Sequence, residues 1–82
     1  MNTQEAKKTI FEVLSNIAPE VNPTSVDHHL DLTEQLDLDS MDYLNWLLGI
    51  SEASGIDIPQ RDVSEFLTIE GAANYVVDHA KT

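Results

Sequence analysis

The sequence predicts an all-α fold, a small four-helix bundle of three main helices plus a short third helix, with a long loop between helices 1 and 2. Apolar residues recur at helical spacing in three segments, and capping residues, Pro or Gly mark the ends of those segments. A chain of 82 residues is long enough for one small hydrophobic core. We therefore expect residues 1–82 to form a single domain.

The first helix is expected to run from about Thr3 to Ala18, with Thr3 as its N-cap and Pro19 ending it. The connection over residues 19–39 is rich in turn-forming residues but also carries apolar side chains. These are Val26, Leu30, Leu32, Leu36 and Leu38. We expect them to hold the connection against the core as a packed loop.

The second helix is expected to begin at Asp39, which can cap the backbone N–H of Asp42, and to end at Gly55. One arc of this helix is apolar and is expected to face the core, with Trp46 at its border. The arc contains Met41, Tyr43, Leu44, Leu47, Leu48 and Ile50.

The C-terminal part is expected to hold a short helical turn from Arg61 to Phe66 and a last helix capped by Thr68. Apolar residues at helical spacing define the inner side of that last helix. They are Ile69, Ala72, Ala73, Val76, Val77 and Ala80.

Composition narrows the functional classes. Fifteen acidic against four basic side chains give a net charge of -11, which disfavours nucleic acid and favours protein partners with basic patches. The same charge predicts a monomer whose stability rises with salt. No cysteine, signal pattern or membrane-spanning run is present, so we expect a cytoplasmic protein without membrane contact. A chain this short is not expected to be an enzyme, and His28 and His29 are expected to be solvated rather than to bind a metal.

Ser40 is the residue best placed to carry a function. It lies where the second helix is expected to begin, and a helix N-terminus offers unpaired N–H groups and a partial positive charge, both suited to a phosphate. Without further context, the favoured interpretation of Ser40 is an ordinary polar residue of a first helical turn.

Three motifs in order give that context. Residues 36–42, LDLDSMD, are similar to the leucine, two spacers and Asp-Ser-Leu-Asp of acyl carrier proteins. Residues 55–59, GIDIP, follow at the expected distance, and Thr68-Ile69 precedes the last helix. Over nearly its whole length the chain resembles the acyl carrier proteins and related phosphopantetheine-binding carrier domains.

The resemblance implies a carrier without catalysis of its own. A phosphopantetheinyl transferase would attach 4'-phosphopantetheine to Ser40, and the thiol of that arm would carry acyl groups as thioesters to acyl-loading ligases or synthases. Asp39 would help to position Mg²⁺ during the transfer, and no resident metal is expected. The resemblance also implies a docking surface for basic enzyme patches. Its expected residues are Asp37, Met41, Asp42, Glu52 and Asp57.

Several positions depart from the family pattern. Asn45 and Ser51 replace acidic residues and Arg61 adds a positive charge, which predicts a specialised partner set. Trp46 and Ser54 replace an aliphatic and an aromatic residue. Trp46 is interpreted first as a boundary residue that covers the core, and our hypothesis is that the changed apolar volume restricts the pocket for acyl chains. Fatty-acid, lipid and polyketide pathways remain open. So do an aminoacyl or peptidyl carrier and an unmodified acidic helical interaction module.

Overall fold

The structure is a computed structural model that describes residues 2–80, and it is all-helical over that range, which confirms the predicted fold class. In chain order the elements are α1 (Thr3–Ile17), the 3₁₀ helix η1 (Pro23–Ser25), α2 (Leu32–Gln35), α3 (Ser40–Ser54), the 3₁₀ helix η2 (Gln60–Phe66) and α4 (Ile69–His79). Within residues 2–80, no helix has the length and apolar character needed to cross a bilayer.

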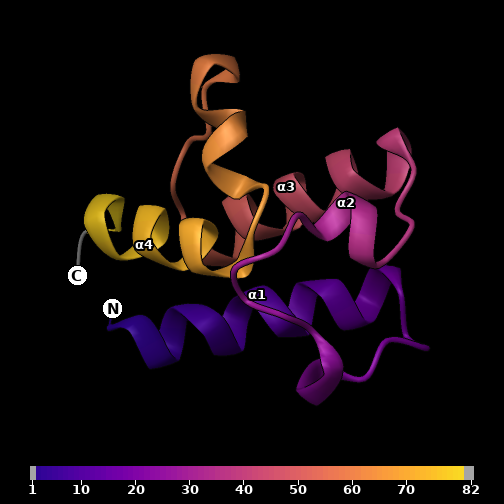
Figure 1. Cartoon of the computed structure of the whole chain (residues 1–82). Helices are drawn as coiled ribbons and strands as arrows, with labels where there is room; N and C mark the ends of the chain where they lie inside the picture. Colours follow the sequence, from indigo (N-terminus) through magenta and orange to yellow (C-terminus); the bar gives the residue numbers. More distant parts are fainter. Residues whose placement is uncertain (1, 81–82) are drawn as a thin grey trace.

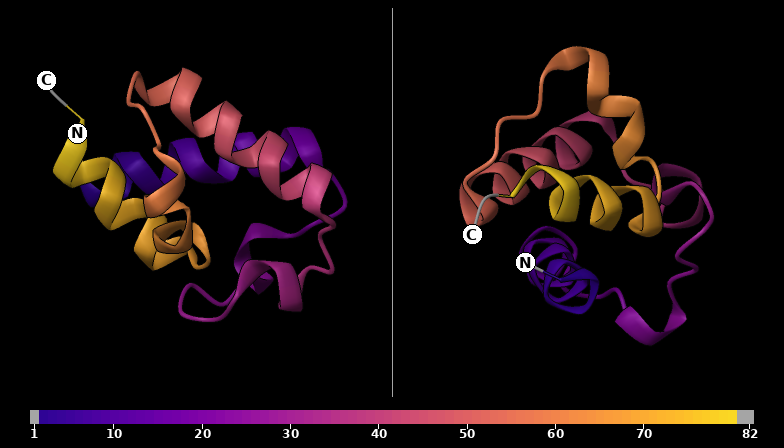
Figure 2. Two further views of the ribbon diagram at one scale, coloured as in Figure 1. Left: turned by 90° about the horizontal axis from the view of Figure 1, so that it is seen from above. Right: turned by 90° about the vertical axis from the view of Figure 1, so that its left-hand side faces the viewer.

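Helix α1 is the base on which the other long helices pack. It contacts both α3 and α4 and runs antiparallel to them, whereas η2 packs on α4 and crosses its direction (Figures 1 and 2). Apolar side chains of α1, α3 and α4 meet at the centre, joined by Phe66 from η2. The fully buried larger side chains are Trp46, Phe66, Ile10, Leu14, Leu32, Ile50, Ile69 and Val76.

Trp46 lies at the centre of this core, so its expected border position was wrong. Its side chain is 0% exposed, its indole N–H donates to the backbone C=O of Ile10 at 3.3 Å, and its ring meets Phe66 edge-on. A close approach of α1 and α3 makes this burial possible. At Gly49, an added Cβ would lie 2.5 Å from Cγ1 of Val13, so only glycine allows that approach without displacement.

The prediction that the whole apolar arc of α3 faces the core was also wrong, because one part of the arc is exposed. Met41, Leu44 and Leu48 are 63%, 49% and 54% exposed, while Leu47 and Ile50 are buried as expected. Residues spaced by three and four lie along one stripe of a helix, and this stripe faces away from α1. The core therefore occupies a narrower part of α3 than the run of apolar residues indicates.

The helix ends follow capping chemistry. The N-cap of α1 is Asn2, which corrects the expected Thr3: its side chain accepts from the N–H of Glu5 at 2.8 Å, and the Glu5 carboxylate accepts from the N–H of Asn2. Thr68 caps α4 as predicted, accepting from the N–H of Gly71 at 2.9 Å. Gly55 ends α3 in the left-handed conformation, at φ 73°.

The connection between α1 and α3 is more ordered than a packed loop. It contains η1 and the single turn of α2, in which the N–H groups of Thr33 and Glu34 donate to the side chain of Asp31. Val26 and Leu32 are buried, but Leu30 is 55% exposed, contrary to expectation. The N–H of Leu32 donates to the C=O of Leu67 at 2.8 Å, which fixes the connection to the corner between η2 and α4.

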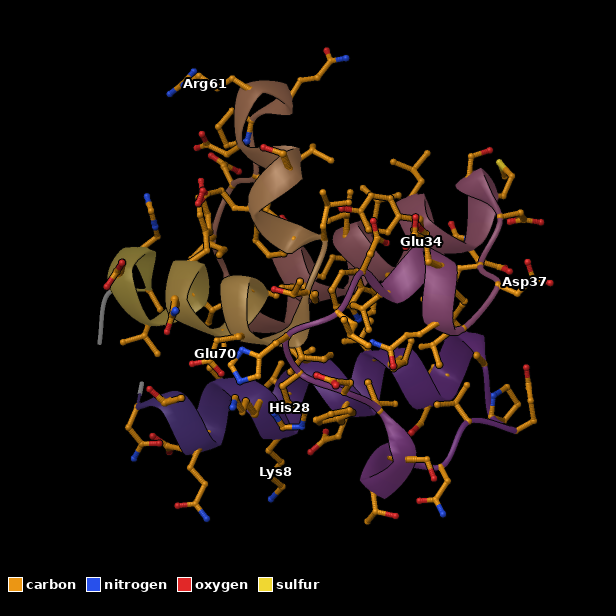
Figure 3. All side chains as sticks on the ribbon, viewed as in Figure 1. Lys8, His28, Glu34, Asp37, Arg61 and Glu70 are labelled. Carbon is orange, nitrogen blue, oxygen red and sulfur yellow. The ribbon has the colours of Figure 1, made fainter. Side chains whose placement is uncertain are left out.

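His28 has a structural place in that connection. Its backbone C=O accepts from the N–H of Glu70, its ring lies against Phe11, and its Nδ1 is 3.0 Å from the ammonium of Lys7. Lys7 also forms an ion pair of 2.9 Å with Glu70, and Figure 3 shows His28 and Glu70 close together. The described residues contain no group of His, Asp and Glu side chains suited to a metal ion.

Candidate functional site

Ser40 is presented on a short, anchored turn. Within this turn, Asp37 has φ 54°, a left-handed conformation that Asp tolerates better than most residues. Leu36 and Leu38 on either side of it are half-buried against the core. The chain therefore reverses between α2 and α3 with two apolar anchors, and Ser40 follows as an exposed residue.

Ser40 is the first residue of α3, and Asp39 is its N-cap, as predicted. The Asp39 carboxylate accepts from the N–H of Asp42 at 2.8 Å, and the first backbone bond of the helix runs from the N–H of Tyr43 to the C=O of Asp39. The N–H groups of Ser40 and Met41 precede that first bond, at the positive end of the helix dipole. They are suited to a phosphate on Ser40.

The Ser40 hydroxyl has no activating base among residues 2–80. His28 contacts Lys7, His79 contacts the backbone C=O of Tyr75, and the exposed His29 has no hydrogen bond to the serine, so none of the three imidazoles is bonded to Ser40. A nucleophilic serine needs such a partner within hydrogen-bond reach. The described residues do not show such a partner for Ser40.

A groove of about 660 Å³ begins at Ser40 and runs between α3 and the segment that contains η2. Its lining is mostly apolar: Tyr43, Leu44, Leu47, Leu48, Ser51, Ile58, Gln60 and Val63 join Ser40. At a helical rise of about 1.5 Å per residue, the eleven steps from Ser40 to Ser51 place these two residues about 16 Å apart along α3. At the far end, the Ser51 hydroxyl donates to the C=O of Ile56 at 2.6 Å.

Tyr43 is a groove residue that the sequence assigned to the core. It is half-buried, and its hydroxyl donates to the backbone C=O of Val63 at 3.1 Å, which joins α3 to η2. Burial, and to a smaller extent the Asp31 carboxylate, raise its pKa to about 12. The sequence could have indicated that Tyr43 lies beside Ser40, because it follows Ser40 by three residues and residues i and i+3 share a helix face.

The expected docking residues divide between the two ends of α3. Asp37, Met41 and Asp42 surround its start, where Asp37 and Met41 are exposed and Asp42 is half-buried. Glu52 and Asp57 are exposed near its end. The exposed stripe of Met41, Leu44 and Leu48 runs from the first group toward the second. Figure 3 shows Arg61 at the start of η2, well separated from Asp37.

The positions that depart from the family pattern differ in their exposure and in their contacts. Asn45 is exposed, but Ser51 is half-buried and hydrogen bonded, so it closes the groove rather than adding to a docking surface. Neither Trp46 nor Ser54 lines the groove, which corrects the expectation that they restrict it. The Ser54 hydroxyl instead donates to the C=O of Ile50, within α3.

Comparisons with known proteins agree with this architecture. The chain is 29% identical over 79 residues to an acyl carrier protein of Rubrobacter xylanophilus, covering 96% of each chain, and 26% identical over 76 residues to one of Zymomonas mobilis, covering 93% and 91%. The structure of an acyl carrier protein from Enterococcus faecalis superposes with a TM-score of 0.79 at 22% identity, over 96% of this chain and 99% of that one, which supports the fold. No family model matches the chain.

Proposed function

Because this chain belongs to the acyl carrier protein family, we propose that Ser40 carries a 4'-phosphopantetheine arm and that the groove beside it receives the acyl cargo. The chain is a carrier and not an enzyme. One observation supports the attachment site above the others: Ser40 is exposed at the capped N-terminus of α3 and at the mouth of an apolar groove.

The residues around Ser40 fit the group. Free N–H groups at the start of α3 and the helix dipole favour a phosphodiester on the hydroxyl, and the exposed serine is open to a transferase. When attached, the arm supplies a terminal thiol that holds acyl groups as thioesters. Asp39 offers a carboxylate next to Ser40 that suits the Mg²⁺ of the transfer reaction, in addition to its role as helix cap.

The groove fits a straight apolar chain. It opens at Ser40, its walls carry leucine, isoleucine and valine side chains, and it continues along three turns of α3. Burying an acyl chain there would protect the thioester from water and would stabilise the fold by about 0.8 kcal/mol for each buried methylene. A fatty-acid, lipid or polyketide pathway would supply cargo of this kind.

The partners proposed for this carrier are a phosphopantetheinyl transferase and acyl-loading ligases or synthases with basic surfaces. Asp37 and Asp42 beside Ser40 would meet basic side chains, and the exposed Met41 and Leu44 would fill an apolar contact between them. Glu52 and Asp57 lie three turns away, so a partner that reaches all four carboxylates must span the length of α3.

The test is the intact mass of the wild type and of Ser40→Ala after incubation with coenzyme A, Mg²⁺ and a promiscuous phosphopantetheinyl transferase. We expect one phosphopantetheine on the wild type and none on Ser40→Ala. A wild type left unmodified by several transferases would contradict the carrier function and favour an unmodified interaction module.

Asp39→Asn separates the two roles of Asp39, because asparagine is as good a helix cap as aspartate. We expect this variant to keep its melting temperature and to be modified at least tenfold more slowly. An unchanged rate would limit Asp39 to capping.

A further inference from the structure

We propose that Tyr43 determines which acyl chains the groove accepts, because its hydrogen bond to Val63 joins the two walls of the groove and must open for a chain to enter. This inference rests on the proposed function. It concerns a further residue of the same site, whose hydroxyl the attachment of the arm does not require.

The bond lies at the entrance. Tyr43 is one turn beyond Ser40, and Tyr43 and Val63 both line the groove from opposite sides. The phenol donates to the Val63 C=O at 3.1 Å, and no other hydrogen bond joins α3 to η2 among the described residues. A chain that starts at Ser40 reaches this bond before it reaches Leu47, Leu48 and Ile58.

The wall that contains Val63 is anchored most firmly at the end of η2. At the end of η2, Phe66 is fully buried between Trp46 and Tyr75, with ring centroids 6.3 Å and 4.9 Å away. At its beginning, Gln60 and Arg61 are exposed. Without the Tyr43 bond, no hydrogen bond among the described residues ties η2 to α3, so η2 can move away from α3 and widen the groove while Phe66 stays buried.

A second tyrosine holds η2 from the other side and provides a matched control. The hydroxyl of Tyr75, in α4, donates to the carboxylate of Asp62 at 2.8 Å. Tyr75 does not line the groove, so its bond fastens η2 to α4 without lying in the path of a chain.

The coupling gives the groove a threshold in chain length. Opening a typical hydrogen bond shifts an equilibrium by about fivefold, and burying one methylene shifts it by about fourfold in the opposite direction. A chain must therefore bury one or two additional methylenes before the open groove is favoured. We infer that short or polar acyl groups stay outside and that longer straight chains are taken in.

The experiment compares wild type, Tyr43→Phe and Tyr75→Phe, each loaded on Ser40 with a series of straight acyl groups that grows by one methylene at a time from acetyl to octanoyl. The gain in melting temperature over the unacylated holo form is measured for each chain. Phenylalanine keeps the ring and removes only the hydroxyl. Amide exchange of residues 60–66 in the unacylated proteins reports on η2 directly.

We expect Tyr43→Phe to gain melting temperature from chains one or two methylenes shorter than the wild type needs, and its η2 amides to exchange about fivefold faster. Tyr75→Phe should melt lower but keep the wild-type dependence on chain length. If Tyr43→Phe follows the wild-type dependence, or needs longer chains, Tyr43 is not the selecting residue although the carrier function stands. If none of the three proteins takes the arm, the proposed function itself fails.

Discussion

Replacing Trp46 by leucine should destabilise the fold strongly, because the structure makes this side chain the largest one in the core. Truncating a buried Trp to Ala costs about 3–5 kcal/mol, and leucine refills part of the space. Losing the indole hydrogen bond to Ile10 adds about 1 kcal/mol. We expect a net loss of about 3 kcal/mol for Trp46→Leu.

A loss of that size is easily measured. For a chain of this length, each kcal/mol shifts the melting temperature by about 4–8 °C, so Trp46→Leu should melt roughly 12–24 °C lower. Thermal and urea unfolding followed by circular dichroism would test this. Trp46 is the only tryptophan, so its wild-type fluorescence should resist acrylamide quenching until the chain unfolds.

Leu48→Ala is the control, since Leu48 lies on the same helix but is 54% exposed. Its effect should stay within about 0.5 kcal/mol. A Trp46→Leu variant within 1 kcal/mol of the wild type, or a wild-type tryptophan quenched as readily as the free amino acid, would refute the central position of Trp46.

Three further predictions concern stability. Gly49→Ala should lower the urea midpoint, because overpacking against Val13 costs about 1–3 kcal/mol while the gain in helix propensity is about 1 kcal/mol; an unchanged midpoint would mean that the helices separate freely. The hydrogen bond and charge of Lys7 lower the pKa of Glu70 from 4.5, so this stabilisation is present above that value and is lost as the pH falls through the lowered pKa. Wild type should therefore melt above Glu70→Gln at neutral pH, and the difference should vanish in acid; a pH-independent difference would contradict this. With a net charge of -11, the melting temperature should rise with added salt, and a fall would argue against charge repulsion.

The features that depend on local chemistry were predictable from the sequence. The caps of α3 and α4 and the glycine that ends α3 follow from a few adjacent residues, and the structure has them as predicted. Thr3 was a plausible N-cap. Asn2 is the N-cap instead, because Glu5 lies three residues after it and the two residues exchange side-chain to backbone hydrogen bonds.

The wrong predictions concern residues of α3 whose burial depends on how other elements pack against that helix. Helical periodicity places Leu44 and Leu48 with the core residues of α3, and it places Trp46 at their border. Only the packed arrangement shows that α1 receives Trp46 while the segment around η2 leaves a groove beside the leucines. The Tyr43–Val63 bond was likewise out of reach, because it joins residues twenty positions apart through a backbone acceptor that any residue type provides.

The antiparallel packing of α1 with α3 and α4 also determines how the molecule can be handled. The first turn of α1 and the last turn of α4 lie side by side, at the end of the bundle opposite the start of α3 (Figures 1 and 2). A surface, fluorophore or second protein attached through either terminus would therefore stand away from Ser40. Immobilised or fused forms should leave the serine open to visiting enzymes, which makes tethered assays of its modification practicable.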